Sequence, residues 1–406
     1  MEKIKTYKCQ NYLVIFLLVI TSIASAIFLD TLLPAIPHIS LFFHSSDQKG
    51  QEIVFYYLLA MAISQLVLGS LMDKFGRRPI LISCLFTMLI CSLISVFSNS
   101  ITFILSLSFI IGLGAGGCSV AVRAIARDCF NKEPLAHAMS IINLFLTVSP
   151  AIFPVLGSYL QHYLGWQSIP YFTSIYLFSS LLLISIFLNE TQKLQHKIKL
   201  GKLLNSYRSA LSAPGFLKHC YISATALSGV YVYFAISTVL LQKQLNVGVI
   251  EYGWLALIFA TTSGVSRLVT VRISKIVAVK KQLLFGVFVM SFSGPLIYLM
   301  VYGLGIKLMG VFIPMLIFVF GTGFVFSASI ALAFENVPHI AGTASSVFGF
   351  LRMLITCALT LLAIHLDQES ILVLATMLTT LSLSAVIFAC IKDRKSISTL
   401  PASVTT

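Results

Sequence analysis

Two ionisable residues lie inside long apolar runs, where a charge is most costly to hold. Asp30 belongs to a run that begins near residue 12, and Arg352 lies about eleven residues into another run. A lone carboxylate in such a place is expensive when ionised, so Asp30 is suited to binding and releasing protons. The alternative is a position at the outer boundary of the run, where Asp30 caps a break near Pro34. An unpaired arginine is also costly, so we expect Arg352 to face a cavity or a carboxylate.

Further polar groups in apolar runs are candidates for lining a cavity. Asp30 is the nearest acid that could pair with Arg352, although the two are expected to lie about 10 Å apart in depth at 1.5 Å per helical residue. Tyr231 and Tyr233 are two positions apart and cannot share one helix face, so we expect at least one of them to serve in packing. The candidate cavity residues are Gln65, Asn143, Tyr231 and Tyr233.

A short turn between two apolar runs concentrates charge. Residues 69–81 read GSLMDKFGRRPIL, with four charged residues in six positions. Gly76 permits a tight reversal of the chain. Asp73 stands at the C-terminal end of a helix, the unfavourable end of its dipole, and therefore needs a partner. That partner is either the nearby arginine pair or the N-terminus of another helix. The remaining residues of interest in the turn are Gly69, Lys74, Arg77 and Arg78.

The elements that carry these residues are expected to be membrane-spanning helices. The chain has 406 residues, of which 58% are hydrophobic and only 10% charged, whereas an ordinary soluble domain is about a quarter charged. The apolar runs are continuous and close to the roughly 20 residues that a spanning helix needs. We place twelve spans near 12–36, 53–72, 79–97, 101–125, 135–160, 167–188, 215–241, 249–271, 283–302, 308–333, 341–364 and 370–391.

Basic residues orient these spans. With a cytoplasmic N-terminus, most Lys and Arg residues fall in inside loops and tails, and the outside loops hold only Lys49, Lys243 and Lys307. This asymmetry predicts that both termini are cytoplasmic. The net charge of +14 is therefore interpreted as an orienting signal and a contact with anionic inner-leaflet lipid, and no nucleic-acid partner is expected.

The spans divide into two sets of six. We predict an all-α integral membrane fold with an N-terminal six-helix bundle over 1–188, a basic cytoplasmic linker over 189–214, and a C-terminal six-helix bundle with a short tail over 215–406. Two bundles joined in this way are typical of secondary transporters, with the substrate site between the halves. Part of the linker has leucines and an isoleucine at roughly helical spacing, which predicts a helix on the inner leaflet or a solvated linker: Leu194, Ile198, Leu203 and Leu204.

Several other classes of protein are disfavoured. The eight cysteines include no CxxC pair, and neither a disulfide framework nor a metal site is expected. The four outer histidines lack metal-ligand spacing. The chain has no Walker loop, no HExxH and no nucleophile–base set, so neither an enzyme nor a cofactor is predicted. The N-terminus resembles a signal peptide, but its removal would leave eleven spans, so we expect the segment to be retained.

Ordered motifs give the chain a family resemblance. The turn at 69–78 resembles the signature loop of the major facilitator superfamily at every key position. Four further segments resemble the bicyclomycin-resistance (Bcr/CflA) type of drug:proton antiporter, and the resemblance covers nearly the whole chain. They read FLDTLLPAIPHIS (28–40), VRAIARD (122–128), VSPAIFPVLGSYL (148–160) and HIAGTASSVFGFL (339–351).

The resemblance implies roles for these segments. In the family, the loop aspartate is held at the N-terminus of span 11 as a latch between the halves, which places Asp73 near Gly342, Thr343 and Ala344. Related exporters use an acidic residue of span 1 for proton coupling, which assigns that role to Asp30. Pro150, Pro154 and Gly157 match the antiporter motif of span 5, and Arg123, Arg127 and Asp128 are expected to form a cytoplasmic charge cluster.

Two positions depart from the family pattern. Ser108 stands where span 4 of drug exporters commonly carries an arginine tied to proton coupling, and Arg352 stands where a glutamine is more frequent. Arg352 is therefore a candidate for supplying the missing charge. Arg123, lower in span 4, is the other candidate.

The expected function is export of amphipathic small molecules, coupled to protons, by alternating access. The expected location is a bacterial-type inner membrane, and the protein is expected to be a monomer. One alternative is a dedicated exporter of a single metabolite, such as a siderophore, an amino acid or a dipeptide. A more distant alternative is a membrane sensor or partner protein that transports nothing.

Overall fold

Twelve apolar helices of spanning length make up most of the molecule. The computed structural model describes residues 2–192, 200–274, 276–305, 307–337, 341–366 and 370–391. Every regular element within these ranges is helical, and twelve of the helices or helix pairs are long and apolar enough to cross a membrane. The predicted all-α fold and the number of spans are thus confirmed, and the protein is a multi-pass integral membrane protein.

The helices follow the apolar runs, with several spans longer than predicted. The first span continues through a 3₁₀ turn into a further helix, so it covers Tyr12–Phe42 rather than 12–36. In chain order the elements are α1 (Glu2–Leu32), η1 (Leu33–Ala35), α2 (Ile36–Phe42), α3 (Asp47–Phe75), α4 (Arg77–Val96), α5 (Ile101–Cys129), α6 (Lys132–Leu164), α7 (Ser168–Phe187), α8 (Leu200–Ser212), α9 (Phe216–Val239), the π-helical turn η2 (Leu240–Gln244), α10 (Val249–Ile273), α11 (Val279–Ser291), α12 (Ser293–Leu304), α13 (Leu308–Phe334), α14 (Ala341–His365) and α15 (Ile371–Cys390).

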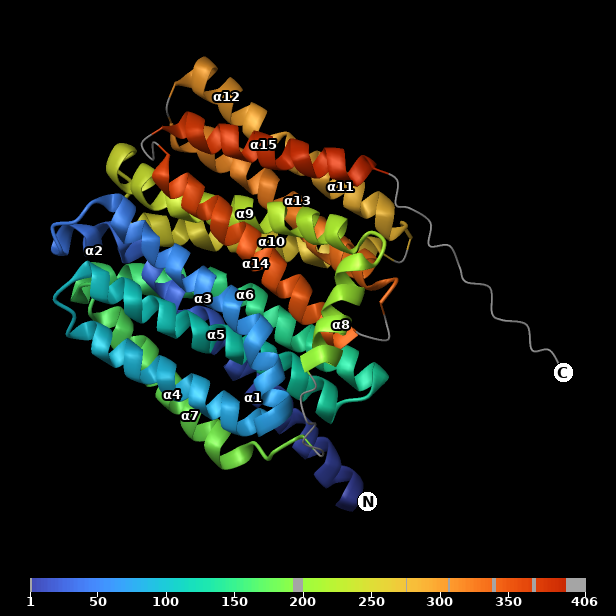
Figure 1. Ribbon diagram of the computed structural model, residues 1–406. Helices are drawn as coiled ribbons and strands as arrows, with labels where there is room; N and C mark the ends of the chain where they lie inside the picture. Colours follow the sequence, from blue (N-terminus) through green and yellow to red (C-terminus); the bar gives the residue numbers. More distant parts are fainter. Residues whose placement is uncertain are drawn as a thin grey trace.

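The helices gather in two groups. Helices α1 to α7 pack on one another, and α9 to α15 form the second group, which lies above the first in Figure 1. The main contacts between the groups are those of α3 with α14 and of α6 with α10. These four helices therefore form most of the boundary between the two groups.

Opposite ends of the assembly carry different elements. Figure 1 shows α2 at one end of the two groups and α8 at the other. We call the end that holds residues 73–78 and 190–192 the linker end, and the end that holds α2 the α2 end. Helices α5 and α10 run toward the linker end, whereas α14 begins there.

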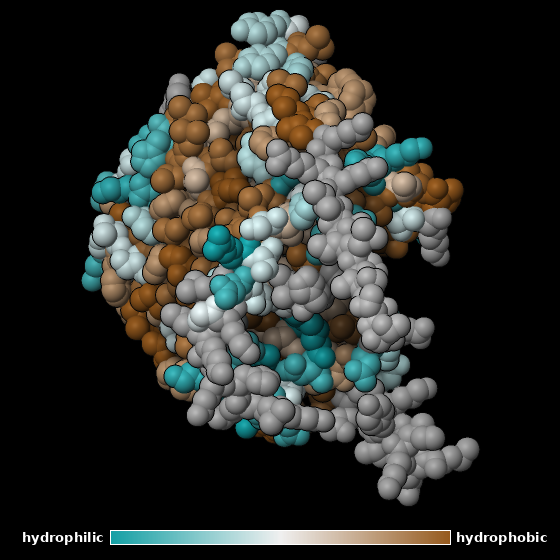
Figure 2. Space-filling view, turned by 45° about the vertical axis from the view of Figure 1, so that its right-hand side comes forward, coloured by the Kyte–Doolittle hydropathy of each residue, from teal (hydrophilic) through white to brown (hydrophobic). Residues whose placement is uncertain are grey.

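Apolar side chains cover the flank of the molecule, as Figure 2 shows. Large exposed hydrophobic residues recur along the outer helices, for example Phe178 and Phe288. Such a surface fits the acyl chains of a bilayer. Within the predicted linker, residues 200–212 form the helix α8. The side chains of Leu194, Ile198, Leu203 and Leu204 lie outside the described part of the chain, so the membrane-surface helix proposed for them stays a prediction.

Candidate functional site

Arg77 organises the charged turn at the linker end. Its guanidinium binds Asp73 at 2.5 Å and Asp128 at 3.1 Å, and so joins α3, α4 and α5. Within the expected cluster, the Asp128 carboxylate lies within electrostatic reach of Arg127, but its ion pair is formed with Arg77. Arg127 instead donates from Nε to the carbonyl of Arg123 at 3.2 Å. One guanidinium with five donors in a fixed fork can satisfy two carboxylates, which the sequence order alone does not reveal.

A glutamate that the motifs do not predict fixes the same turn. Glu190 accepts hydrogen bonds from the amides of Arg77 at 3.0 Å and Arg78 at 3.1 Å, the first amides of α4. Gly76 has a φ of +100°, and a Cβ there would meet the Glu190 carboxylate. Gln192 adds a bond from its side-chain nitrogen to the carbonyl of Asp73 at 2.6 Å. The glycine is therefore required both by the backbone turn and by the close approach of Glu190.

The pKa of Glu190 follows from these bonds. Burial alone would raise it, but hydrogen bonds from backbone amides outweigh that effect and lower the pKa below its ordinary value of 4.5. A lowered pKa means that the contribution of Glu190 is complete above 4.5 and is lost as the pH falls through the value in the folded protein. The turn should therefore loosen in acid.

We predict that Glu190→Ala frees the first turn of α4. The amides of Arg77 and Arg78 should exchange with deuterium about tenfold faster at pH 7, because each loses a charge-assisted hydrogen bond of about 1.5–3 kcal/mol. Hydrogen–deuterium exchange of the peptide that covers the turn measures this effect. Glu335→Ala, at an exposed site beyond α13, serves as the control. Unchanged exchange in Glu190→Ala would mean that the loop fixes the turn without this side chain.

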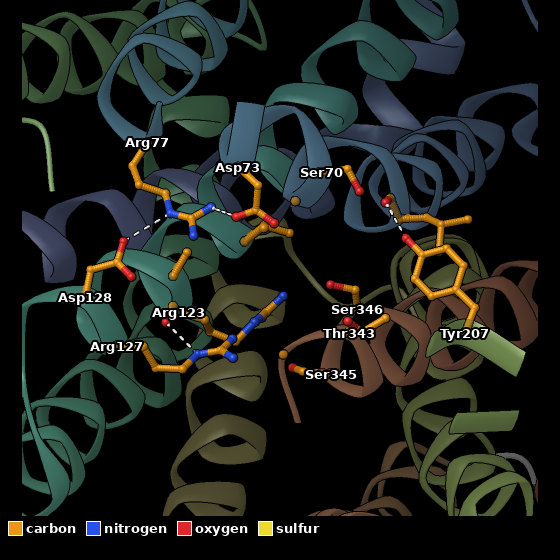
Figure 3. Close-up of a pocket in the computed structure, with 15 residues that line it drawn as sticks. Ser70, Asp73, Arg77, Arg123, Arg127, Asp128, Tyr207, Thr343, Ser345 and Ser346 are labelled. Atoms are coloured by element: carbon orange, nitrogen blue, oxygen red, sulfur yellow. Dashed lines mark hydrogen bonds and ion pairs between the residues drawn. The ribbon is translucent and has the colours of Figure 1, made fainter. Parts of the chain in front are cut away.

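A pocket of about 260 Å³ opens at the linker end between the two groups of helices. Figure 3 shows its walls: Asp73, Arg77, Arg123 and Arg127 on one side, with residues of α14 facing them. The described hydrogen bonds of Asp73 do not reach the amides of Gly342 or Thr343, although all three residues line the pocket. Helix α3 contacts α14 near the turn at Gly69, where a Cβ would lie 3.6 Å from the Ser346 hydroxyl.

Asp30 lies nearer the middle of its span than predicted. Because the span extends to Phe42, Asp30 lies three residues from its midpoint, on the side of the α2 end. The carboxylate accepts a hydrogen bond from Ser149 of α6 at 3.3 Å. Ser149 belongs to the predicted antiporter segment, so the structure brings the acid of span 1 and the motif of span 5 together.

Arg352 and Tyr231 lie, like Asp30, in the middle parts of their spans. Both are close to the midpoints of their spans, Gly342–His365 and Phe216–Gln244. Asp30 and Arg352 do not form an ion pair within 4 Å, and the phenol of Tyr231 is within electrostatic reach of both. The guanidinium of Arg352 lies over the Phe348 ring at 5.8 Å. A polar layer from α1, α9 and α14 thus crosses the interior.

Arg267 is a half-buried cation that the motifs do not predict. It lies within the apolar run of α10, donates to the hydroxyl of Thr147 on α6, and stands 6.0 Å from the centre of the Phe326 ring. Arg123 makes a comparable contact, since it donates to Gln65 at 3.4 Å. An arginine inside a predicted span was a sufficient signal to find Arg267.

The antiporter segment forms close helix contacts on two sides. A Cβ on Gly157 would overlap the backbone of Thr31, so α6 approaches α1 at van der Waals distance. A Cβ on Gly253 would overlap Ser158 and lie 3.1 Å from Val155 Cα, so α10 of the other group packs equally close. Pro150 and Pro154 lie inside α6, which continues through both. The segment therefore connects the first span to the opposite group.

Two polar contacts join the groups at the α2 end. Lys243 of η2 binds Asp47 at 2.7 Å, and Gln242 donates to the carbonyl of Pro34 at 3.1 Å. The π-helical turn carries both donors and faces them toward the first group. These contacts hold the α2 end together, while the pocket leaves a passage at the linker end.

The remaining candidates have simpler surroundings. Lys74 lies over the ring of Phe75 at 4.8 Å, and Arg78 donates to the Ser185 carbonyl at 2.6 Å. Tyr233 is buried and stacks on Phe259, whereas Asn143 is exposed. The hydroxyl of Ser108, at the position of the family arginine, is buried and has no hydrogen-bond partner in the part of the chain that the structure describes. Among the described residues, no group of His, Cys, Asp and Glu has the arrangement of a metal site.

Comparisons with known proteins extend over both groups of helices. The sequence model of the Major Facilitator Superfamily matches residues 18–360. Multidrug resistance protein D of Escherichia coli (strain K12) is 24% identical over 336 residues, which cover 83% of this chain and 84% of the relative. The bicyclomycin resistance protein homolog of Haemophilus influenzae is 24% identical over 346 residues, with 84% and 86% covered. Multidrug resistance protein MdtL of Escherichia coli O139:H28 is 28% identical over 242 residues, with 60% and 61% covered.

Proposed function

Because the chain belongs to the Major Facilitator Superfamily, as its motifs predicted, we propose that it is a multidrug efflux transporter that exchanges amphipathic small molecules for protons. The names of its relatives support efflux of drugs. The observation that carries proton coupling is the position of Asp30, a carboxylate near mid-span whose described hydrogen bond comes from one neutral hydroxyl. Such a bond is worth about 1.5–3 kcal/mol, whereas desolvating an ion costs several kcal/mol. Protonation relieves that cost.

Transport proceeds by alternating access of the two groups of helices. The linker end faces the cytoplasm of a bacterial-type inner membrane, in agreement with the distribution of basic residues. The pocket at this end and the polar contacts at the α2 end fit a molecule that receives its substrate from the inside. Opening to the outside requires Lys243 and Gln242 to release Asp47 and Pro34.

Asp73 acts as a latch in the opposite state. Its carboxylate lines the same pocket as Gly342 and Thr343 of α14, and closure of that pocket would bring it toward amides that favour an anion. Arg77 holds the carboxylate in the structure, which corresponds in this proposal to the disengaged latch. Arg77 therefore acts as its partner while the linker end is open.

Purified protein in liposomes with an imposed pH gradient tests this function. Addition of a panel of amphipathic drugs and metabolites should release protons from the acidic compartment, as reported by a pH-sensitive dye inside the vesicles. A protonophore should abolish the signal, and protein-free liposomes give the background. Substrate movement at the same rate with and without the gradient would show a transporter without proton coupling. The absence of any substrate movement would favour a membrane sensor.

A further inference from the structure

Three arginines lie within the apolar spans near the boundary between the two groups of helices: Arg123 lines the pocket there, Arg267 bonds to Thr147 of the other group, and Arg352 is the third. The chain has 27 Lys and Arg residues, and the other 24 lie outside the spans or at their ends. The three come from α5, α10 and α14, so both groups of helices contribute. Topology accounts for basic residues at span ends, but it does not account for these.

The geometry of the helices brings the three side chains to one level. Arg123 and Arg267 each lie six residues before the end of their helix at the linker end, about 9 Å from it at 1.5 Å per residue. Side chains tilt toward the N-terminus of their helix, so both point toward the middle of the molecule. Arg352, on a helix of opposite direction, points from the middle toward the linker end. Arg352 is accordingly within electrostatic reach of both other arginines.

The positive charges of this cluster are not balanced by the side chains that the structure describes. Its polar partners are neutral, namely Gln65 for Arg123 and Thr147 for Arg267. The Nε of Arg352 is buried and has no hydrogen-bond partner among the described residues. The ion pairs of the described residues lie at the two ends of the molecule. Like charges in a desolvated space repel one another, which is costly unless an anion enters.

We infer that Arg123, Arg267 and Arg352 form the binding site for the anionic group of an amphipathic organic acid, which is the transported substrate. A planar guanidinium with several hydrogen-bond donors matches the geometry of a carboxylate. Three guanidinium groups together offer more donors than a single carboxylate needs. The inference rests on the proposed function, whose substrate class it names. In this assignment the arginines bind the acidic group of the substrate, and Asp30 binds the proton.

The surroundings of the cluster explain why the substrate should be amphipathic. The Phe348 ring lies below Arg352, and the Phe326 ring lies beside Arg267, so apolar surface begins where the charges end. The pocket of about 260 Å³ reaches Arg123 from the linker end, as Figure 3 shows. Small-molecule sites usually measure about 300–1,000 Å³, so this pocket is smaller than a complete site. It admits a charged head group. An apolar body would fit only if the two groups of helices separate further.

Equilibrium binding to the purified full chain in a neutral detergent tests the inference. The probes are 4-phenylbutyrate, its uncharged amide 4-phenylbutyramide, and the cation 4-phenylbutylammonium, with calorimetry as the readout. We expect wild type to prefer the carboxylate over the amide by at least tenfold and to bind the cation least. Arg352→Gln and Arg267→Gln should each weaken carboxylate binding at least tenfold and change amide binding less than twofold. Arg272→Gln, at an exposed site on the same helix as Arg267, should behave as wild type.

The Tm of the ligand-free protein separates a binding role of Arg352 from a structural one. If Arg352 binds the anion and its charge is uncompensated without ligand, Arg352→Gln should keep or raise this Tm while anion binding is lost. Arg352→Lys should then retain part of the binding. A lower Tm of the Gln variant with unchanged carboxylate binding would overturn the inference. So would the absence of any preference for the carboxylate in wild type. Displacement of 4-phenylbutyrate by dihexanoyl-phosphatidylglycerol, but not by dihexanoyl-phosphatidylcholine, would assign the site to a lipid phosphate and overturn the substrate assignment.

This experiment is independent of proton coupling. Binding is measured at equilibrium without a pH gradient, so a failure of antiport through Asp30 leaves the result intact. Conversely, a failure of anion binding leaves proton flux driven by neutral or cationic drugs measurable in liposomes.

Discussion

Replacement of Asp30 by Asn should abolish proton flux driven by substrate in liposomes. The amide keeps the size of the side chain and can still accept the hydrogen bond of Ser149, but it cannot bind and release a proton. Transport that depends on the pH gradient should therefore fall to the level of protein-free liposomes. Exchange of labelled substrate at equal pH on both sides should persist, because it needs no net movement of protons.

The two assays together separate coupling from folding. Glu335→Gln removes an acid at an exposed position outside the spans and should keep wild-type flux. Asp30→Glu lengthens the side chain but keeps the titratable group, so it should retain measurable flux. Wild-type proton flux in Asp30→Asn would transfer the coupling role to another residue. Loss of exchange as well as flux would show that Asp30 is needed for substrate binding or for the conformational change.

Gly157→Ala should reduce transport at least tenfold and lower the Tm by several degrees. The added Cβ would overlap the backbone of Thr31, and a backbone cannot move aside as a flexible side chain can. Overpacking of this kind typically costs about 1–3 kcal/mol. The shift would also displace Asp30, which is adjacent to Thr31, from Ser149 on the same helix as Gly157. We therefore expect Gly157→Ala to reduce transport by more than its loss of stability alone would cause.

The same substitution at another helical glycine is the matched control. Gly303 of α12 has open space where a Cβ would lie. Alanine favours a helix over glycine by about 1 kcal/mol, so Gly303→Ala should leave transport unchanged and keep or raise the Tm. Thermal unfolding of both variants in the same detergent shows directly whether the Tm falls in Gly157→Ala and holds or rises in Gly303→Ala. An equal effect at the two sites would mean that α1 and α6 do not depend on close contact at Gly157.

The sequence predicted those features that depend on hydropathy or on a local motif. Continuous apolar runs are the strongest signal that a chain can carry, and the number of spans was confirmed. The span boundaries were less certain: the first span continues past Pro34 to Phe42 because a 3₁₀ turn joins two helices there. That extension brings Asp30 closer to the midpoint of the span, three residues from it on the side of the α2 end, which no hydropathy window shows.

Contacts between distant segments could not be predicted in the same way. Glu190 reaches the amides of Arg77 and Arg78 across more than a hundred residues, and nothing in the local sequence NETQ predicts that contact. Asp128 forms its ion pair with Arg77, a contact that the local sequence does not predict. Asp73 is held by Arg77 in this structure, and a motif indicates the contacts of a family without indicating the conformation. Arg267 could have been found, since an arginine within an apolar run is itself a signal.

The ion pair between Lys243 and Asp47 makes closure of the α2 end sensitive to ionic strength. Both side chains are partly exposed, and pairs of this kind contribute about 0–1 kcal/mol and are screened by salt within about 8 Å at physiological ionic strength. A contribution of 1 kcal/mol corresponds to about a fivefold change in the ratio of closed to open molecules. In a dilute medium the pair holds the α2 end shut more firmly, and in a saline medium it yields more readily. The salt content of the surroundings thereby adjusts how often the α2 end opens.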